Sequence, residues 1–405
     1  MKSKLIAVAL FTFTASAIAF YPAIKKVGAI NIQPPDTPFQ APQVKPIVQQ
    51  QPKIEVVFAL DTTGSMGGLI QTAKEKIWSI ATTMSQVQPA PEIKMGLVAY
   101  RDRGDQYITR RVDLTNDLDS VYATLMDFRA EGGGDGPESV NQALDEAVNK
   151  MSWSQQKDAY RAVFLVGDAP PHMDYQDDVK YPQTLAEAKN RGIVVNTIQA
   201  GSDGATQLVW NKIAEAGFGQ YAQVSEDGNA VAISTPYDKQ LAKLSKQLDD
   251  TRLYYGTEEV RAKKREKLAA ADKLHASASV ESRARRATFN SSKSGKSNLL
   301  GERELVDAVT SGRVELDAID KHHLPAPMQA MAPEKQQAMI TKMAEQRKAL
   351  QQEIKALSLQ RSDFLKKEVK KSDLATNSFD QKLYGAIREQ AGRIGIQYEA
   401  EAPAY

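Results

Sequence analysis

Two continuous apolar runs, each followed by an aspartate at one end, most constrain what this chain can fold into. Val56–Leu60 precedes Asp61, and Ala162–Val166 precedes Asp168 by one residue. Apolar runs that do not alternate with polar residues are typical of parallel strands covered by helices on both faces. Helical patterns separate further strand-like segments between residues 53 and 250, so the sequence predicts an α/β fold with a doubly wound, mostly parallel sheet. Both aspartates are expected at the carboxyl edge of that sheet, where such folds bind ligands.

The composition excludes several classes of site. The 405 residues include no cysteine and only four histidines, which rules out disulfides, thiolate metal sites and cysteine nucleophiles and argues against a histidine-rich zinc site. Lysine and arginine number 52 against 50 acidic residues. This near balance lacks the basic excess typical of a nucleic-acid-binding chain, so we expect no nucleic-acid partner.

The first residues resemble an export segment. Met1–Lys4 is basic, Leu5–Ile18 is mostly apolar, and small residues between positions 15 and 19 offer cleavage sites. We therefore expect residues 1–19 to be a signal peptide and the protein to be periplasmic or secreted. If the segment is not cleaved, it would anchor the chain in the inner membrane, which is the only membrane association expected. Residues 20–53 are rich in proline and glutamine and are predicted to form an extended tether.

The segment after the first apolar run carries the most specific motif of the chain. It reads Asp61-Thr62-Thr63-Gly64-Ser65 and resembles the Asp-x-Ser/Thr-x-Ser motif of von Willebrand factor type A (VWA) domains, whose metal-ion-dependent adhesion site (MIDAS) binds a divalent cation. Two later segments resemble the second and third metal loops of that family, in the same order: Gly132-Gly133-Gly134-Asp135-Gly136-Pro137-Glu138 and Val166-Gly167-Asp168-Ala169-Pro170-Pro171. The resemblance implies a VWA domain of bacterial exported type, which we place over residues 54–235.

The residue types also suit a cation site on chemical grounds. Mg²⁺ prefers oxygen ligands and retains several waters, and Thr63 and Ser65 offer neutral hydroxyl oxygens on one turn. Asp61 and Asp168 supply negative charge from two strand ends. An alternative interpretation is that the two hydroxyls only cap the next helix. The cation is expected to be Mg²⁺, with Mn²⁺ or Ca²⁺ left open.

The second loop departs from the family pattern. Gly136 stands where the family usually carries a metal-binding threonine. Asp135, Glu138 or a water molecule could replace it, and Asp135 is preferred over Glu138. The predicted metal ligands are therefore Asp61, Thr63, Ser65, Asp135 and Asp168. His172, which follows the third loop, is interpreted as a solvated loop residue.

The resemblance implies a binding protein and not an enzyme. We expect the cation to accept an acidic side chain of a partner protein, as in adhesive members of the family. A second hypothesis is a helical scaffold in which the metal is only structural. A third is an aspartate-nucleophile phosphohydrolase, because the first motif also resembles Asp-Lys-Thr-Gly-Thr, although Ala169-Pro170-Pro171 does not continue like such an enzyme.

The remainder of the chain is predicted to be helical. We expect a basic helical extension over residues 236–290, a polar linker over 291–300, helices over 301–372, and a C-terminal helix and tail over 373–405. Apolar residues recur at heptad spacing in a coiled-coil-like segment over 334–369, with Arg347 and Arg361 on the same seam. This seam could pack within the chain or support an oligomer through the helices after residue 333.

Overall fold

The computed structural model describes residues 51–134, 136–228, 233–371 and 379–398. The predicted signal peptide and nearly all of the tether lie outside the described residues. Residues from Gln51 onward form one compact unit. Among the helices described, none is both long enough and apolar enough to cross a bilayer.

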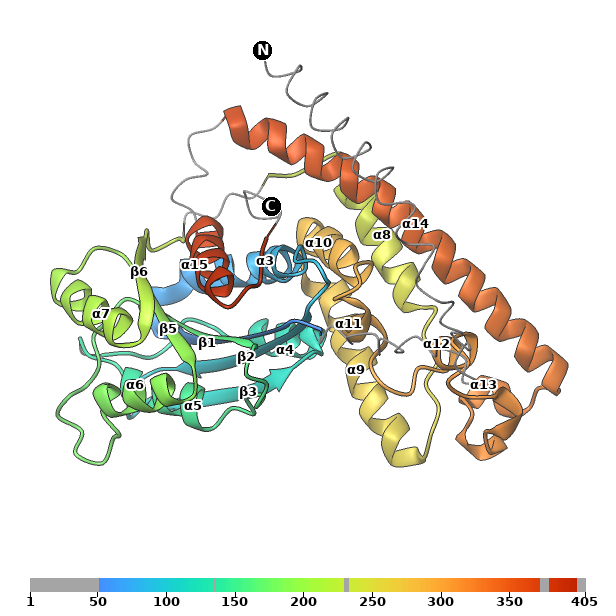
Figure 1. The fold of residues 1–405 in the computed structure, drawn as a ribbon, viewed down its shortest axis with the longest axis horizontal. Helices are drawn as coiled ribbons and strands as arrows, with labels where there is room; N and C mark the ends of the chain where they lie inside the picture. The colour runs from blue at the N-terminus through green and yellow to red at the C-terminus, as the bar shows by residue number, and fades with distance from the viewer. Residues whose placement is uncertain (1–50, 135, 229–232, 372–378, 399–405) are drawn as a thin grey trace, which may run out of the picture. The chain divides into compact units, whose positions relative to one another are not determined.

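The first part of this unit is a mixed, mostly parallel sheet of six strands in the order β3-β2-β1-β4-β5-β6 (Figure 1). Only β3 runs antiparallel to its neighbour. The predicted fold class is therefore confirmed. Strand order reverses between the neighbours β1 and β4, so their carboxyl ends border the crevice in which such sheets bind ligands. The strands are β1 (Lys53–Asp61), β2 (Glu92–Tyr100), β3 (Thr109–Thr115), β4 (Tyr160–Gly167), β5 (Ile193–Ala200) and β6 (Phe218–Val224).

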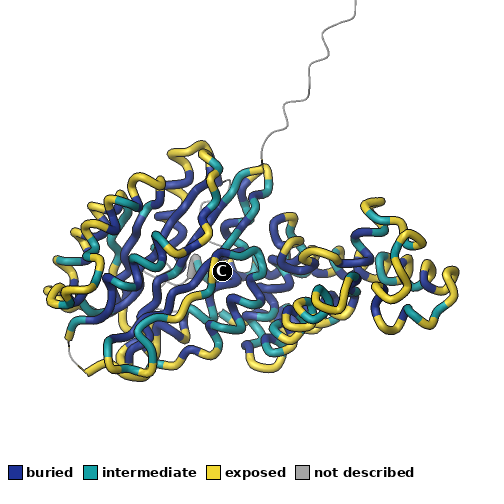
Figure 2. Tube along the Cα trace, turned by 90° about the horizontal axis from the view of Figure 1, so that it is seen from below, coloured by how far each residue is buried: buried dark blue, intermediate teal, exposed yellow. Residues whose placement is uncertain are grey.

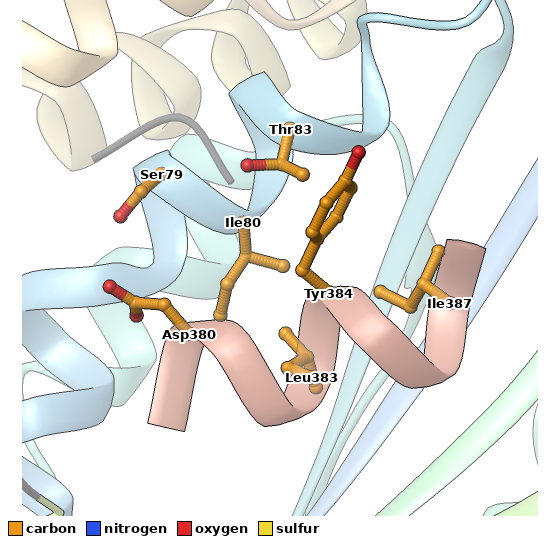
Figure 3. A pocket seen from close by; sticks show the side chains of 7 residues that line it. All are labelled: Ser79, Ile80, Thr83, Asp380, Leu383, Tyr384 and Ile387. Carbon is orange, nitrogen blue, oxygen red and sulfur yellow. The ribbon is translucent and has the colours of Figure 1, made fainter. Parts of the chain in front are cut away.

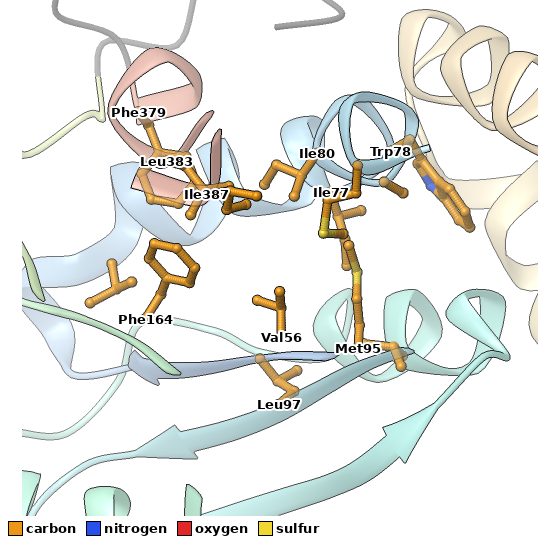
Figure 4. Close-up of a cluster of buried hydrophobic side chains, with 14 of the residues drawn as sticks. Val56, Ile77, Trp78, Ile80, Met95, Leu97, Phe164, Phe379, Leu383 and Ile387 are labelled. Atoms are coloured by element: carbon orange, nitrogen blue, oxygen red, sulfur yellow. The ribbon is translucent and has the colours of Figure 1, made fainter. Parts of the chain in front are cut away.

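Helices cover both faces of the sheet because successive strand residues point to opposite sides. In β1, Val56 and Leu60 join the core beneath α3, α4 and α15, whereas Val57 and Ala59 join the core beneath α5, α6 and α7. Figure 4 shows the first core between the sheet and the helices α3 and α15, and Figure 2 shows that most of the sheet is buried. These helices are α3 (Gly67–Met84), α4 (Leu118–Leu125), α5 (Val140–Asn149), α6 (Tyr181–Asn190), α7 (Gly204–Ala216) and α15 (Phe379–Arg393).

A helical region follows β6 and has its own apolar clusters. One cluster joins α8, α10, α11 and α14, and the other joins α12, α13 and the first part of α14. The elements of this region are α8 (Asp238–Asp249), α9 (Glu258–Ser277), α10 (Val280–Asn290), α11 (Lys296–Leu300), α12 (Leu305–Thr310), η2 (Leu316–Ala318), η3 (Lys321–His323), α13 (Ala326–Gln329) and α14 (Pro333–Lys371).

The heptad seam of α14 packs within the chain. Leu350 and Ile354 are 9% and 0% exposed and belong to the cluster with α8 and α10. Arg347 is paired with Glu304 at 2.9 Å, and Arg361 with Asp238 at 2.7 Å. The two arginines on the seam are thus explained by buried acidic partners in the same chain. The structure thus shows the seam packed within the chain, and an oligomer through the helices after residue 333 stays a prediction.

Part of the predicted polar linker is structured. Residues 296–300 form α11, in which Asn298, Leu299 and Leu300 are buried. Gly295 is the N-cap that precedes this helix, and a Cβ there would lie 1.9 Å from the carbonyl oxygen of Phe289. The segment was predicted to be a linker because most of its residues are polar, but the two leucines at the end of the segment are buried and hold the helix in place.

The chain returns to the sheet at its C-terminal helix. Leu383 and Ile387 of α15 pack on α3 beside a small hollow of about 10 Å³, roughly the space for one water molecule (Figure 3). Lys76 of α3 forms a buried ion pair with Asp380 at 2.6 Å. Helix α15 therefore completes one helical layer of the α/β part, with Asp380 lying 304 residues along the chain from Lys76.

A buried ionic network joins the α/β part to the helical region. Arg286 of α10 is 0% exposed and lies between Asp119 of α4 and Asp249 of α8, at 2.6 and 2.7 Å. His275 of α9 contacts Asp249 at 2.7 Å. Burial of a guanidinium is tolerated only when carboxylates compensate it, so this network fixes the two parts to each other.

Candidate metal site

The three predicted metal loops lie together at the carboxyl edge of the sheet. The amide of Gly64 donates to the carbonyl oxygen of Gly132 at 3.2 Å, which ties the first loop to the second. The amide of Glu138 donates to Pro170 at 2.9 Å, and the amide of His172 donates to Glu138 at 3.1 Å. The second loop is therefore also paired with the third. Segments more than 30 residues apart in sequence converge as the strand-end positions of Asp61 and Asp168 predicted.

Asp61 is the last residue of β1 and is fully buried. Its Oδ1 accepts hydrogen bonds from the amide and the hydroxyl of Thr63, at 2.9 and 2.7 Å. Its Oδ2 is buried and has no hydrogen-bond partner among the described residues. Burial raises the pKa of Asp61 to about 7, the Thr63 bonds oppose this, and the charge of Asp168 adds to it. A Cβ on Gly167 would lie 3.0 Å from that of Asp61, so the absence of a side chain there leaves room for this carboxylate.

The two hydroxyls of the first motif face each other. Thr63 Oγ1 and Ser65 Oγ are 3.5 Å apart, in the turn that leads into η1 (Gly64–Met66) and α3. Thr63 is 2% exposed and Ser65 is exposed. Neither η1 nor α3 has a side-chain hydrogen bond at its N-cap. The capping interpretation of Thr63 and Ser65 is therefore wrong. The Thr63 hydroxyl instead donates a hydrogen bond to Asp61 Oδ1.

The second loop brings Glu138 to the site. Glu138 is 4% exposed, and its Oε2 has no hydrogen-bond partner among the described residues. Burial, followed by the charges of Asp61 and other nearby carboxylates, raises the pKa of Glu138 to about 9. A Cβ on Gly133 would lie 3.3 Å from Thr63 Cβ and 3.5 Å from Glu138 Oε1, so both side chains border the same small space.

The other predicted ligands are placed less fully. Asp168 directly follows β4, is half-buried, and acts electrostatically on both Asp61 and Glu138. Asp135 lies outside the described residues, so its role stays a prediction. Gly136 is exposed, with nothing within 4 Å of the position a Cβ would take. Glu138, which the sequence analysis ranked below Asp135 as a metal ligand, is the acidic residue of this loop that lies beside Thr63.

The donor set fits a hard divalent cation. Two hydroxyls and three carboxylates border the site, and two of the carboxylate oxygens are buried without a partner, which is costly unless a positive charge compensates them. Within the described ranges, no three acidic or imidazole side chains form a ready-made metal cluster. A cation here would therefore depend on Thr63 and Ser65 for part of its shell.

His172 differs from its prediction as a solvated residue. It is 5% exposed, and its ring stacks on Tyr175 with the ring centres 4.0 Å apart. Its Nδ1 lies 2.8 Å from Asp174, and its Nε2 lies 3.3 Å from Asp102. The prediction was wrong because the carboxylate nearest Nε2, Asp102, comes from a different loop, the one that follows β2. Both ring nitrogens face carboxylates.

Known proteins are similar to the part of the chain that contains the sheet and the three loops. Residues 55–236 match the family model of the von Willebrand factor A domain. The von Willebrand factor A domain-containing protein 7 of Rattus norvegicus is 37% identical over 97 residues, 24% of this chain and 10% of that protein. The alpha-protein kinase vwkA of Dictyostelium discoideum is 27% identical over 121 residues, 29% of this chain and 19% of that protein. The chain thus spans less than a fifth of the length of these relatives.

A solved structure of proximal thread matrix protein 1 from the mussel byssus, with a zinc-occupied MIDAS motif, matches at a TM-score of 0.34 and 16% identity, over 44% of this chain and 42% of that one. This likeness is too slight to transfer the zinc to the present chain. The family match, by contrast, coincides with the sheet and with all three loops. Residues 55–236 therefore form a von Willebrand factor A domain.

Proposed function

We propose that the converging loops bind a divalent cation, Mg²⁺ in the first instance, and present it to an acidic group of a partner protein. The observation that carries this proposal is the pair of buried, unpartnered carboxylate oxygens of Asp61 and Glu138 beside the hydroxyl of Thr63. Ionising the buried carboxyl groups of Asp61 and Glu138 beside Asp168 costs free energy unless a cation compensates the charge, in agreement with their raised pKa values. When bound, the cation supplies a positive charge that can accept an oxygen from outside the chain.

The residues of the chain have separate roles in this proposal. Thr63 and Ser65 provide neutral oxygens, and Asp61 fixes the Thr63 hydroxyl through its Oδ1. Asp168 and Glu138 contribute negative charge from the third and second loops. Asp135 remains a further candidate. The exposure of Ser65 leaves one side of the site open to a partner.

Binding is favoured over catalysis by the position of Asp61. An aspartate nucleophile must reach its substrate, whereas the side chain of Asp61 is 0% exposed and is held by two hydrogen bonds. We also propose that the protein is exported, which the basic and apolar residues 1–18 support. VWA domains generally mediate protein–protein interaction, which agrees with a binding role.

Calorimetric titration with Mg²⁺, Mn²⁺ and Ca²⁺ tests the cation. The wild type should take up at least one of these ions, and Asp61→Asn and Thr63→Val should abolish the uptake because each removes a ligand or its support. Asp177→Asn is a matched control, since Asp177 is exposed and pairs with Arg103, and neither residue belongs to the three motifs. Far-ultraviolet circular dichroism verifies folding. Uptake that is absent in the wild type, or unchanged in Asp61→Asn, rejects the proposal.

Capture of a partner in Mg²⁺ and in chelator separates the two binding hypotheses. If the cation contacts the partner, capture should require Mg²⁺ and fail with Thr63→Val. In the alternative scaffold role, the cation only stabilises the loops, which main-chain hydrogen bonds also connect. Capture that is unchanged by both chelator and Thr63→Val would reject contact between the cation and the partner and would support that alternative.

A further inference from the structure

A basic hollow lies beside the first metal loop and has no part in the site described above. Its volume is about 270 Å³, and its walls come from the end of β2, the start of β3 and the segment after α4. The residues that matter for its chemistry are Arg101, Tyr107, Arg110, Arg129 and Glu131. This space is large enough for a carboxylate-bearing side chain together with water.

Two guanidinium groups lie over one aromatic ring in this hollow. The central carbons of Arg101 and Arg110 are 4.5 and 4.4 Å from the centre of the Tyr107 ring. Each interaction with the ring is favourable, but two like charges on one small ring repel each other. Arg110 is exposed, so solvent screens part of this repulsion, and a bound anion would reduce it further.

The positive charges of the hollow are poorly compensated by the chain itself. Arg101 donates to the main-chain carbonyls of Thr62 and Arg129, which carry no charge, and Glu131 stands 3.7 Å from it with 57% of its side chain exposed. Within the part of the chain that the structure describes, neither Arg110 nor Arg129 has an ion pair. The other acidic residue of the wall, Asp127, is paired with Lys273 at 2.6 Å.

The hollow is connected to the metal loop through Thr62. The Tyr107 hydroxyl and Thr62 Oγ1 are 2.7 Å apart, and Thr62 Oγ1 donates to the carbonyl oxygen of Tyr100 at 2.9 Å, so Tyr107 is the donor in the first bond. Thr62 stands between Asp61 and Thr63, both proposed to act at the cation. An extended segment that reaches the cation can therefore reach the hollow with a neighbouring residue.

We propose that this hollow binds a second carboxylate of the partner, at Arg110 and Arg129, while the first carboxylate meets the cation. The inference deepens the proposed function and rests on it for the identity of the occupant. Guanidinium groups bind carboxylates through paired, charge-assisted hydrogen bonds, and Arg110 and Arg129 have this capacity available. The partner segment is therefore acidic at two positions.

Fluorescence anisotropy with labelled glycine–serine peptides tests the proposal. The peptides carry one aspartate, or two aspartates at graded separations. In Mg²⁺, at least one two-aspartate peptide should bind about tenfold more tightly than the one-aspartate peptide. The double variant Arg110→Gln/Arg129→Gln should lose this advantage. Arg111→Gln should keep it, because Arg111 is exposed and alternation along β3 points it to the opposite face from Arg110. Arg101 is left intact because it supports Thr62.

A second arm, in chelator, separates this proposal from the cation. Glutarate is titrated into the full chain, and the response of arginine side-chain resonances is followed by NMR. Binding in the wild type that is lost in the double variant supports the hollow even if no cation binds. If the wild type takes up Mg²⁺, glutarate binding without any gain for a two-aspartate peptide overturns the proposal in favour of a free small anion. A two-aspartate advantage that survives the double variant, or no advantage together with no glutarate response, also overturns it.

Discussion

Replacing Arg286 with methionine should be among the most damaging single changes to stability in this protein. The Arg286 guanidinium lies within hydrogen-bond distance of all four carboxylate oxygens of Asp119 and Asp249, at 2.6 to 3.1 Å. Methionine fills similar space but compensates neither charge. Asp249 retains Arg252 and His275, whereas the Asp119 carboxylate retains one long hydrogen bond from Asn298 at 3.4 Å and the charge of Lys267, so the cost arises mainly at Asp119.

The expected loss is about 3–5 kcal/mol of the free energy of unfolding, the usual cost of removing one partner from a buried ion pair. Burial by itself would raise the pKa of Asp119, but the charge and hydrogen bonds of Arg286 outweigh it and hold that pKa below 3.8. A carboxyl group whose pKa is lowered by folding stabilises the protein above its unfolded pKa and ceases to do so as pH falls through the folded value. The loss should therefore be full at pH 7 and shrink below about pH 4.

Urea denaturation followed by circular dichroism measures the loss. Arg265→Met is the matched control, because Arg265 pairs with Glu258 on the surface with both side chains 61% exposed. Its cost should stay below about 1 kcal/mol. Adding Asp119→Leu to Arg286→Met should restore part of the stability by removing the uncompensated charge. If Arg286→Met costs no more than Arg265→Met, the network does not have the role argued for it.

Three further outcomes are expected. In chelator, the free energy of unfolding measured by urea titration should fall as pH rises from about 5 to about 9, because the folded pKa values of Glu138 and Asp61, about 9 and about 7, exceed their unfolded values. Saturating Mg²⁺ should flatten this dependence on pH. A flat curve in chelator would contradict the prediction. Gly167→Ala should cost about 1–3 kcal/mol and weaken Mg²⁺ uptake, since its Cβ would lie 2.4 Å from the Tyr100 hydroxyl oxygen; unchanged calorimetry would refute this. Ile387→Ala, at a residue 1% exposed, should lower the free energy of unfolding by about 2–5 kcal/mol, and a loss under about 1 kcal/mol would show that α15 contributes little.

The sheet and the convergence of the loops could be predicted because they follow from local patterns. The run from Val56 to Leu60 defines a buried strand, and a parallel sheet necessarily gathers its carboxyl ends at one edge. Thr63 and Ser65 lie on one turn for the same local reason. The family resemblance of three motifs in order then located the second and third loops.

The remaining features depend on contacts with residues distant in the sequence, which no local pattern predicts. The burial of His172 depends on Asp102 and Tyr175, and the seam arginine Arg347 depends on Glu304. The contacts of Tyr107 with two guanidinium groups could not be predicted from the sequence, because only the fold brings Arg101 and Arg110 to its ring. Pairings across long sequence separations are set by tertiary packing.

Helix α15 also bears on how the protein is made. Since α15 covers α3 and the strands beneath it, the apolar surface of this layer stays incomplete while a ribosome is still translating the helical region that precedes it. Contacts of such long sequence separation close late and slow folding. A chain released before Phe379 would leave the part of this layer that α15 covers exposed and prone to aggregate, so a chaperone that binds the nascent chain until α15 emerges would reduce aggregation.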